Sequence, residues 1–188
     1  MKKGKRILAA FLAVLMVVAI MPFTMFSGMF TSKAKAAESG KKYTFEGTEL
    51  EAATTAGKYT DGQAVTAGTD GYFTFYMSAK TKIDGSEKTW PDGSILAQRI
   101  NFGGKADIAN MKNFVSFKTE GTAKVKIYWV EGGADNRQIA IFGSKGDVVT
   151  KTEVTAAKNE AVVSTLELAD AGTYYLGGLE NNNYIFKV

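Results

Sequence analysis

Short apolar runs separated by turn residues are the dominant pattern of the chain from residue 72 onward. Val125, Ile127 and Trp129 alternate with Lys124 and Lys126, which is the period of a strand with one buried face. Asp-Gly and Gly-Gly pairs mark the turns, and no stretch in this region sustains helical periodicity. The pattern predicts nine short strands, at residues 72–77, 95–102, 114–117, 122–130, 139–142, 148–151, 162–168, 173–176 and 184–188.

So many short strands with frequent glycine turns predict an all-β fold, an antiparallel β-sandwich of jelly-roll type. We place this domain at residues 43–188, after a short flexible lead-in at residues 37–42. Its length is enough for one domain with a core of its own.

The first 36 residues look different from the rest. A basic start is followed by an almost wholly apolar stretch and then by Ala34-Lys35-Ala36, which is a typical signal peptidase site. We therefore expect a signal peptide at residues 1–36, cleavage before Ala37, and a secreted protein with no membrane attachment. The apolar stretch is long enough to cross a bilayer, so an uncleaved anchor is the alternative.

Removing the leader changes the charge. Six of the 23 Lys and Arg residues lie in residues 1–36, which have no acidic residue, so the remainder has 17 basic residues against 19 acidic ones. The basic excess belongs to the leader and gives no support for nucleic-acid binding. Cys and His are absent, which excludes disulfides, His-assisted nucleophiles and the usual zinc sites.

Several segments resemble a known group of proteins. They are Gln98-Arg99-Ile100, the strand from Ala123 to Trp129, the stretch from Asp135 to Ile141, Gly146, and Ala171-Gly172-Thr173-Tyr174-Tyr175-Leu176. Together they resemble the non-catalytic β-sandwich modules of secreted bacterial pectate lyases and related polysaccharide-degrading enzymes. The resemblance covers residues 43–188 and implies a galactose-binding-like or carbohydrate-binding-module-like fold. A Gly-Thr-Tyr-Tyr strand also occurs in other secreted sandwiches, and the β-helix lyase domain that accompanies such modules does not fit in this chain.

Aromatic rings stack on the C–H faces of sugars, so both tryptophans are candidate ligand-binding residues. Trp129 continues the apolar alternation of its strand, which favours the core over an exposed platform. Trp90 precedes Pro91 in a turn-rich segment, and we expect it to be exposed; the alternative is a loop plug over the sandwich.

Arg137 is the strongest polar candidate, because a guanidinium can hold a uronate carboxylate with two parallel hydrogen bonds. The alternative is an ion pair with Glu131 or Asp135 that fixes the loop. Gln98 and Arg99 are adjacent on a strand and point to opposite faces, so only one of them can line the same cleft. The remaining candidates are amides and a tyrosine, in a run that could equally be a structural turn: Asn136, Gln138, Asn181, Asn182, Asn183 and Tyr184.

We predict a non-catalytic module that binds plant cell-wall polysaccharide, with pectic chains as the first ligand, and that brings an associated enzyme to its substrate. The alternatives are a structural or protein-interaction sandwich and a fragment of a polysaccharide lyase. No cofactor is predicted, although a structural Ca²⁺ is weakly indicated by Glu46, Glu49, Asp70 and Asp107. A glycosidase would need two converging carboxylates, and the spacing of the candidates does not indicate convergence: Glu120, Glu131, Asp135, Glu167 and Glu180.

Overall fold

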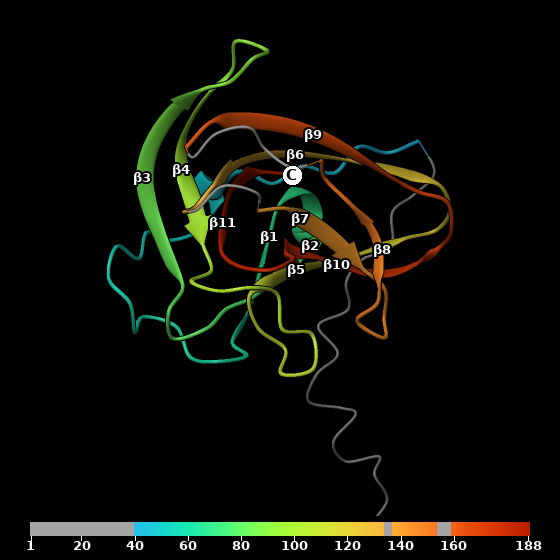
Figure 1. Cartoon of the computed structure of the whole chain (residues 1–188), viewed down its shortest axis with the longest axis horizontal. Coiled ribbons are helices and arrows are strands. Elements are labelled where there is room, and N and C mark those ends of the chain that lie inside the picture. The colour runs from blue at the N-terminus through green and yellow to red at the C-terminus, as the bar shows by residue number, and fades with distance from the viewer. Residues whose placement is uncertain (1–39, 134–136, 154–158) are drawn as a thin grey trace, which may run out of the picture. The chain divides into compact units, whose positions relative to one another are not determined.

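A computed structural model describes residues 40–133, 137–153 and 159–188. Strands and short turns make up this part of the chain, together with two short 3₁₀ helices (Figure 1). The 3₁₀ helices are η2 (Gly47–Glu49) and η3 (Thr69–Gly71). The strands are β1 (Ala64–Ala67), β2 (Phe73–Tyr76), β3 (Lys82–Thr89), β4 (Ile95–Asn101), β5 (Phe114–Thr119), β6 (Ala123–Glu131), β7 (Ile139–Phe142), β8 (Val148–Lys151), β9 (Ala161–Leu168), β10 (Gly172–Gly178) and β11 (Asn183–Lys187).

The strands form two antiparallel sheets, which confirms the all-β prediction. The six-stranded sheet has the order β1-β2-β5-β10-β7-β8, and the five-stranded sheet has the order β3-β4-β11-β6-β9. In Figure 1, β6 and β9 of the five-stranded sheet run above β5 and β10 of the six-stranded sheet. All nine predicted strands are present. The sequence pattern did not reveal β1 and β3, each of which lies at an outer edge of its sheet.

The main core lies between the two sheets. It includes alternate residues of β6, which are Val125, Ile127 and Trp129, together with aromatic side chains of β2 and β5. Lys124 and Lys126 of β6 point the other way and are exposed, as the alternation predicted. Burial of these apolar faces on the two sheets is the main stabilising contribution to the fold.

A second, smaller cluster covers the outer face of the five-stranded sheet. Trp90, from the turn between β3 and β4, packs edge-on against Tyr128 and Phe186, with ring centroids 5.4 and 5.2 Å apart. Leu96 and Val130 complete the cluster. Asp92 fixes the same turn by accepting a 2.6 Å hydrogen bond from the Tyr128 hydroxyl. The β3–β4 hairpin therefore folds back over its own sheet.

Residues 40–46, here called the N-terminal segment, run beside the end of β11. Phe45 and Val188 exchange two backbone hydrogen bonds of 2.9 and 3.0 Å. Thr44 is held by η3, because its carbonyl accepts a 2.8 Å hydrogen bond from the Thr69 amide. Gly68 precedes η3 with φ 86°, and a Cβ there would lie 2.8 Å from the Thr44 carbonyl oxygen, so the close approach requires glycine.

Candidate functional site

The two tryptophans are buried. Trp129 is completely buried and its indole N–H donates a 3.0 Å hydrogen bond to the Ser164 hydroxyl, so it belongs to the core. Trp90 is only 2% exposed, and the prediction that it is exposed was wrong. The turn residues Pro91, Asp92 and Gly93 are exposed, but the indole of Trp90 points inward and packs on Tyr128 and Phe186. Neither ring offers a face to a sugar in this structure.

Arg137 is half-buried and donates from Nη1 to the backbone carbonyl of Asn182 at 2.7 Å. This hydrogen bond joins Arg137 to the protein's own backbone. Asn136 and Asp135 lie outside the described residues. Arg137 thus connects the start of β7 to the β10–β11 turn, a contact between segments that sequence spacing does not reveal.

Arg99 and Gln98 point in different directions, as expected for neighbours on a strand. Arg99 pairs with Asp84 at 2.6 Å, and its guanidinium carbon lies 3.9 Å from the centre of the Tyr184 ring. Gln98 instead donates to the carbonyls of Gly47 and Leu50, and so holds η2 against β4. The Arg99 guanidinium covers one face of the Tyr184 ring, so a sugar cannot stack on that face.

The amide residues mostly bond to the protein's own backbone. Gln138 donates to the Thr152 carbonyl at 2.5 Å, and buried Asn183 donates to the Gln138 carbonyl at 3.0 Å. Asn181 accepts a 2.8 Å hydrogen bond from the Asn182 amide within the β10–β11 turn. Asn182 also accepts from the Gly103 amide at 3.3 Å. These bonds match the structural-turn interpretation of the run.

The structure therefore brings four predicted residues into one network, which are Arg99, Arg137, Asn182 and Tyr184. Tyr184 joins it by donating a 3.3 Å hydrogen bond to the carbonyl of Gly132, and a Cβ on Gly132 would contact both Asn182 and Tyr184. The polar groups of this network hold loops together, whereas the two tryptophan rings are buried in apolar clusters. Its hydrogen bonds to backbone groups indicate a structural role.

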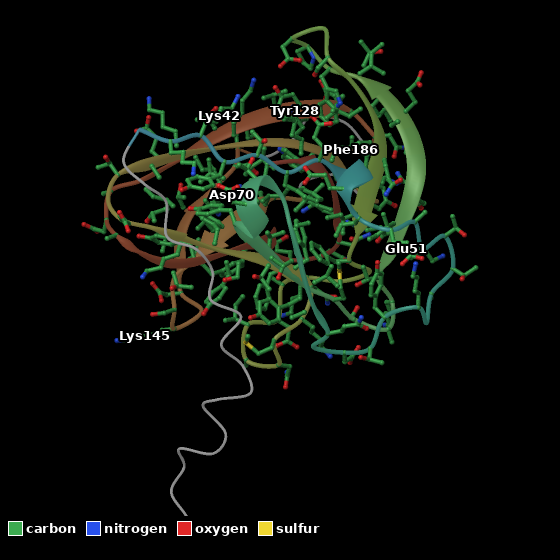
Figure 2. All side chains as sticks on the ribbon, turned by 180° about the vertical axis from the view of Figure 1, so that it is seen from behind. Lys42, Glu51, Asp70, Tyr128, Lys145 and Phe186 are labelled. Carbon is green, nitrogen blue, oxygen red and sulfur yellow. The ribbon has the colours of Figure 1, made fainter. Side chains whose placement is uncertain are left out.

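A groove of about 670 Å³ lies elsewhere, between the N-terminal segment and the first half of β6. Figure 2 labels Lys42 and Tyr128, which lie along the same side of the domain and belong to this groove. Its apolar lining includes Phe73, Phe117 and Val125 from the end of the core. Its polar lining consists mainly of lysines and tyrosines, with one carboxylate among the described lining residues: Lys41, Lys42, Lys124, Lys126, Lys187, Tyr43, Tyr72, Tyr128 and Glu120.

The groove lysines contact aromatic rings and acidic residues around the rim. Lys126 lies 4.7 Å from the centre of the Tyr128 ring and 3.2 Å from Asp92. Hydrogen bonding with Tyr128 and Asp92 raises the pKa of Lys126, so this group is a cation at neutral pH. Lys187 pairs with Glu46 at 2.5 Å, and the exposed Lys124 pairs with Glu167 at 3.0 Å. Exposed pairs of this kind are weak and can be shared with a ligand.

Two tyrosines form the wall of the groove beneath the N-terminal segment. Tyr43 and Tyr72 are stacked, with ring centroids 3.9 Å apart and an interplanar angle of 18°. The Tyr72 hydroxyl donates to the carbonyl of Lys118. Burial, with a smaller contribution from Tyr43, raises the pKa of Tyr72 to about 12. This hydroxyl is therefore neutral at any physiological pH.

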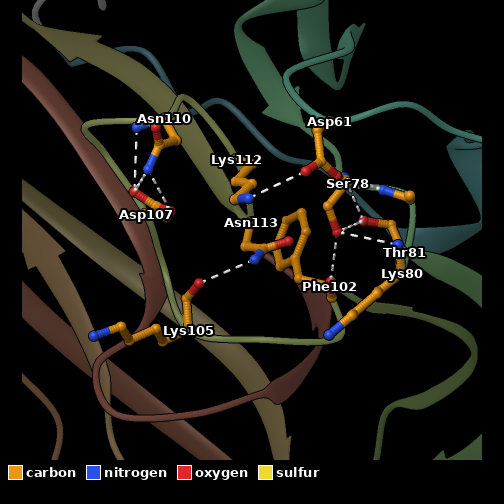
Figure 3. Close-up of polar contacts among 11 residues, drawn as sticks. Asp61, Ser78, Lys80, Thr81, Phe102, Lys105, Asp107, Asn110, Lys112 and Asn113 are labelled. Carbon is orange, nitrogen blue, oxygen red and sulfur yellow. Dashed lines mark hydrogen bonds and ion pairs between the residues drawn. The ribbon is translucent and has the colours of Figure 1, made fainter.

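The candidate calcium ligands do not converge. Figure 3 shows both carboxylate oxygens of Asp107 accepting hydrogen bonds from the Asn110 side chain, at 3.1 and 3.0 Å. Asp70 pairs with Lys41, and Glu49 accepts from the Glu46 and Gly68 amides. Within residues 40–133, 137–153 and 159–188, no group of three or more acidic side chains is arranged to hold a metal ion.

The carboxylates considered for catalysis are also dispersed. Glu131 is completely buried, Glu167 lies on the exposed face of β9 beside Lys124, and Glu120 lines the groove. Asp135 lies outside the described residues. The groove thus offers a cationic, aromatic surface and no carboxylate pair among the residues that line it in the described part of the chain.

Comparison with known proteins leaves the family open. No protein-family model matches the chain, and no curated protein matches it. In the described part of the chain, no helix has the length and apolar character that a membrane crossing requires. Function must therefore be argued from the groove itself.

Proposed function

We propose that this chain is a secreted, non-catalytic binding module for an acidic polysaccharide, with pectic chains as the first ligand. The groove is the observation that carries the proposal. Five lysines, three tyrosines and one glutamate line it, and four of the lysines form ion pairs with carboxylates around the rim. An acidic ligand would compete with these exposed pairs for the lysines. Lysine rims attract carboxylates, and tyrosine rings offer flat surfaces and hydroxyls that suit sugars.

The chemistry of the groove favours an anionic polymer over a neutral one. The domain as a whole has 17 basic against 19 acidic residues after the predicted leader, so the local excess of lysine is a property of this surface. A uronate residue on every sugar would place repeated carboxylates along such a rim. The contacts are exposed and compete with water, so we expect modest affinity that falls as salt screens the charges.

We also propose a jelly-roll connection of the strands. The chain passes between the sheets at each step from β4 to β7 and again from β8 to β11. Repeated crossing between two facing antiparallel sheets is the connectivity that supports this assignment.

The test is affinity electrophoresis in native gels that contain polygalacturonate, neutral galactan or no polymer. The protein is expressed with its leader, so that its mass also reports whether cleavage before Ala37 has occurred. We expect retardation by polygalacturonate only. The double change of Lys124 and Lys126 to Ala should reduce it at least about tenfold, because it removes two of the rim cations.

The matched controls are Lys145→Ala and Arg137→Ala. Lys145 is an exposed lysine that does not line the groove, and it lies well away from Lys42 and Tyr128 in Figure 2. Arg137→Ala tests the strongest polar candidate of the sequence analysis and the network around it, and it should leave retardation intact. Loss of retardation in Arg137→Ala but not in the lysine variant would move the ligand to that network. No retardation by any polymer would reject the polysaccharide proposal.

A further inference from the structure

The two edges of β6 are not paired to the same extent. Toward β9, β6 is paired continuously from Ala123 to Val130. Toward β11, the pairing runs only from Glu131 to Tyr128, where Tyr128 faces Lys187. Among the described residues, the backbone of residues 123–127 has no strand partner on the β11 side. About five residues of this strand edge therefore have no partner strand within the described part of the chain.

The N-terminal segment lies across the gap from this open edge. Lys187 faces Tyr128 on one side, so its antiparallel bridge to Glu46 lies on its other side. Phe45 then pairs with Val188, and residues 40–44 continue past the end of β11. Two strands that flank a third are about 9.5 Å apart. The N-terminal segment and β6 are thus separated by the width of one strand.

The groove occupies this gap. Its lining includes residues 40–44 on one side, residues 121–126 on the other, and Lys187 and Val188 at one end. Alternate side chains of β6 differ in direction: Val125 faces the core with Phe73 and Phe117, whereas Lys124 and Lys126 are exposed. The gap therefore has an apolar floor and an outer rim of lysines, in which Lys124 pairs with Glu167 and Lys126 with Asp92. Acidic side chains of a ligand would compete with Glu167 and Asp92 for these lysines.

We propose that the groove is an open strand position that accepts an extended acidic peptide segment of a partner protein. The peptide adds to the five-stranded sheet between β6 and the N-terminal segment, and its backbone pairs with residues 123–127. This interaction uses the same groove as the proposed polysaccharide site, but it depends on the open backbone edge and not on sugar recognition. Strand addition of this kind derives affinity from main-chain hydrogen bonds and specificity from alternate side chains.

The alternating directions of the β6 side chains determine which peptide sequence can pair with this strand. Cross-strand neighbours on one face have Cβ atoms about 5 Å apart. Side chains of the peptide that point outward would lie beside Lys124 and Lys126, where acidic residues are favoured. Those that point inward would contact Val125, Phe73 and Phe117, where residues such as Val are favoured. The ligand is therefore a short segment in which acidic and apolar residues alternate.

The test measures fluorescence anisotropy of a labelled peptide, acetyl-Glu-Val-Glu-Val-Glu-Val-Glu-amide, on titration with the purified protein. Its length of about seven residues covers the open edge with an overhang at each end. Hydrogen exchange of the bound protein is followed in parallel. We expect saturable binding and slower exchange of backbone amides within residues 123–127, because strand pairing removes them from water.

Two peptide controls separate strand pairing from charge attraction. A peptide with the central Val replaced by Pro keeps the charge but loses a backbone donor and disturbs pairing, so it should bind at least about tenfold more weakly. A peptide with Lys in place of every Glu should not bind. On the protein side, the double change of Lys124 and Lys126 to Glu should weaken binding at least about tenfold, whereas Lys145→Glu should not.

The outcomes distinguish this inference from the polysaccharide proposal. Equal binding of the Pro peptide, or unchanged exchange of residues 123–127, overturns strand addition even if the peptide binds. Retardation by polygalacturonate without peptide binding also overturns it and leaves the proposed function standing. Peptide binding with slowed exchange, and no retardation by any polysaccharide, supports strand addition alone and makes the chain a protein-interaction module.

Discussion

The two tryptophans illustrate how burial at single residues decides which side chains are available to a ligand. Trp129 has a hydrogen-bond partner for its indole N–H, whereas the N–H of buried Trp90 has none among the described residues. An unpaired buried donor carries a desolvation cost. The burial and ring contacts of Trp90 must outweigh that cost, so its contribution is to stability.

We expect Trp90→Ala to lower the free energy of unfolding by about 3 to 5 kcal/mol, because it leaves a cavity beside Tyr128 and Phe186. Urea denaturation measures the change. Ile95→Ala is the control, since Ile95 is 63% exposed and should change stability by less than about 0.5 kcal/mol. A stability loss below about 1 kcal/mol for Trp90→Ala would contradict the buried role.

Tyr72 gives a prediction for alkaline pH. Its folded pKa of about 12 lies above the ordinary value of 10.0, mainly because burial disfavours the phenolate. In the unfolded chain the Tyr72 hydroxyl loses its proton near pH 10, whereas in the folded protein it keeps the proton up to about pH 12. The contribution of Tyr72 to the free energy of unfolding is therefore complete below pH 10 and is lost as pH rises from 10 toward 12. The loss should reach about 2 kcal/mol.

The comparison is between the native protein and Tyr72→Phe, which cannot ionise at this position. Urea denaturation at a series of alkaline pH values should show a smaller decline for the variant. Tyr59 and Tyr175 also have pKa values raised by burial, so part of the decline should remain. An identical pH profile for the two proteins would show that Tyr72 does not contribute.

At the scale of elements, the β3–β4 hairpin depends on one carboxylate at its turn. Hydrogen bonds from Tyr128 and from Ser94 lower the pKa of Asp92 well below its ordinary value of 3.8. Because the pKa of Asp92 is lower in the folded protein, the ionised carboxylate stabilises the fold at pH values above 3.8, and this stabilisation is lost as pH falls below 3.8. The contacts of this turn with β6 should therefore weaken in acid.

We expect Asp92→Asn to loosen the turn already at neutral pH, because it removes the charge that faces Lys126 and weakens the bond to Tyr128. Acrylamide quenching of tryptophan fluorescence measures the exposure of Trp90, against the constant background of the fully buried Trp129. The native protein should become more quenchable below about pH 4, and the variant should change less. Equal quenching of the two proteins at neutral pH would contradict an anchoring role.

Elements were predictable where the local pattern matched their environment. Strands such as β6 and β9 alternate clearly, and glycine turns marked their ends. β3 was missed because Lys82–Thr89 contains Asp84, Gly85, Ser86, Glu87 and Lys88, and its pairing with β4 includes a bulge between Gly85 and Lys88. Such an edge strand owes its structure to its neighbour, which short-range pattern does not show.

For the whole molecule, the sequence predicted the architecture but not the groove. The groove combines residues 40–44, 72–73, 117, 119–126, 128 and 187–188, which only the arrangement of the sheets brings together. The exposed Lys124 and Lys126 were visible as the polar half of an alternating strand. Their significance depends on the early end of β6–β11 pairing, which no local signal indicates. The contacts of Arg137 and Asn183 were not predictable from the sequence either, because both side chains donate to backbone carbonyls of segments about 45 residues away.

The gap beside β6 also bears on self-association. An outer strand edge that captures one strand presents a new edge to the next, which is how sheets grow into fibrils. A gap with a chain on both sides is filled by a single strand and presents no new edge. At the outer strand β8, pairing with β7 is already irregular between Ile141 and Phe142, which makes that edge a poor template. Filling the gap with one strand would therefore not by itself start the growth of a sheet.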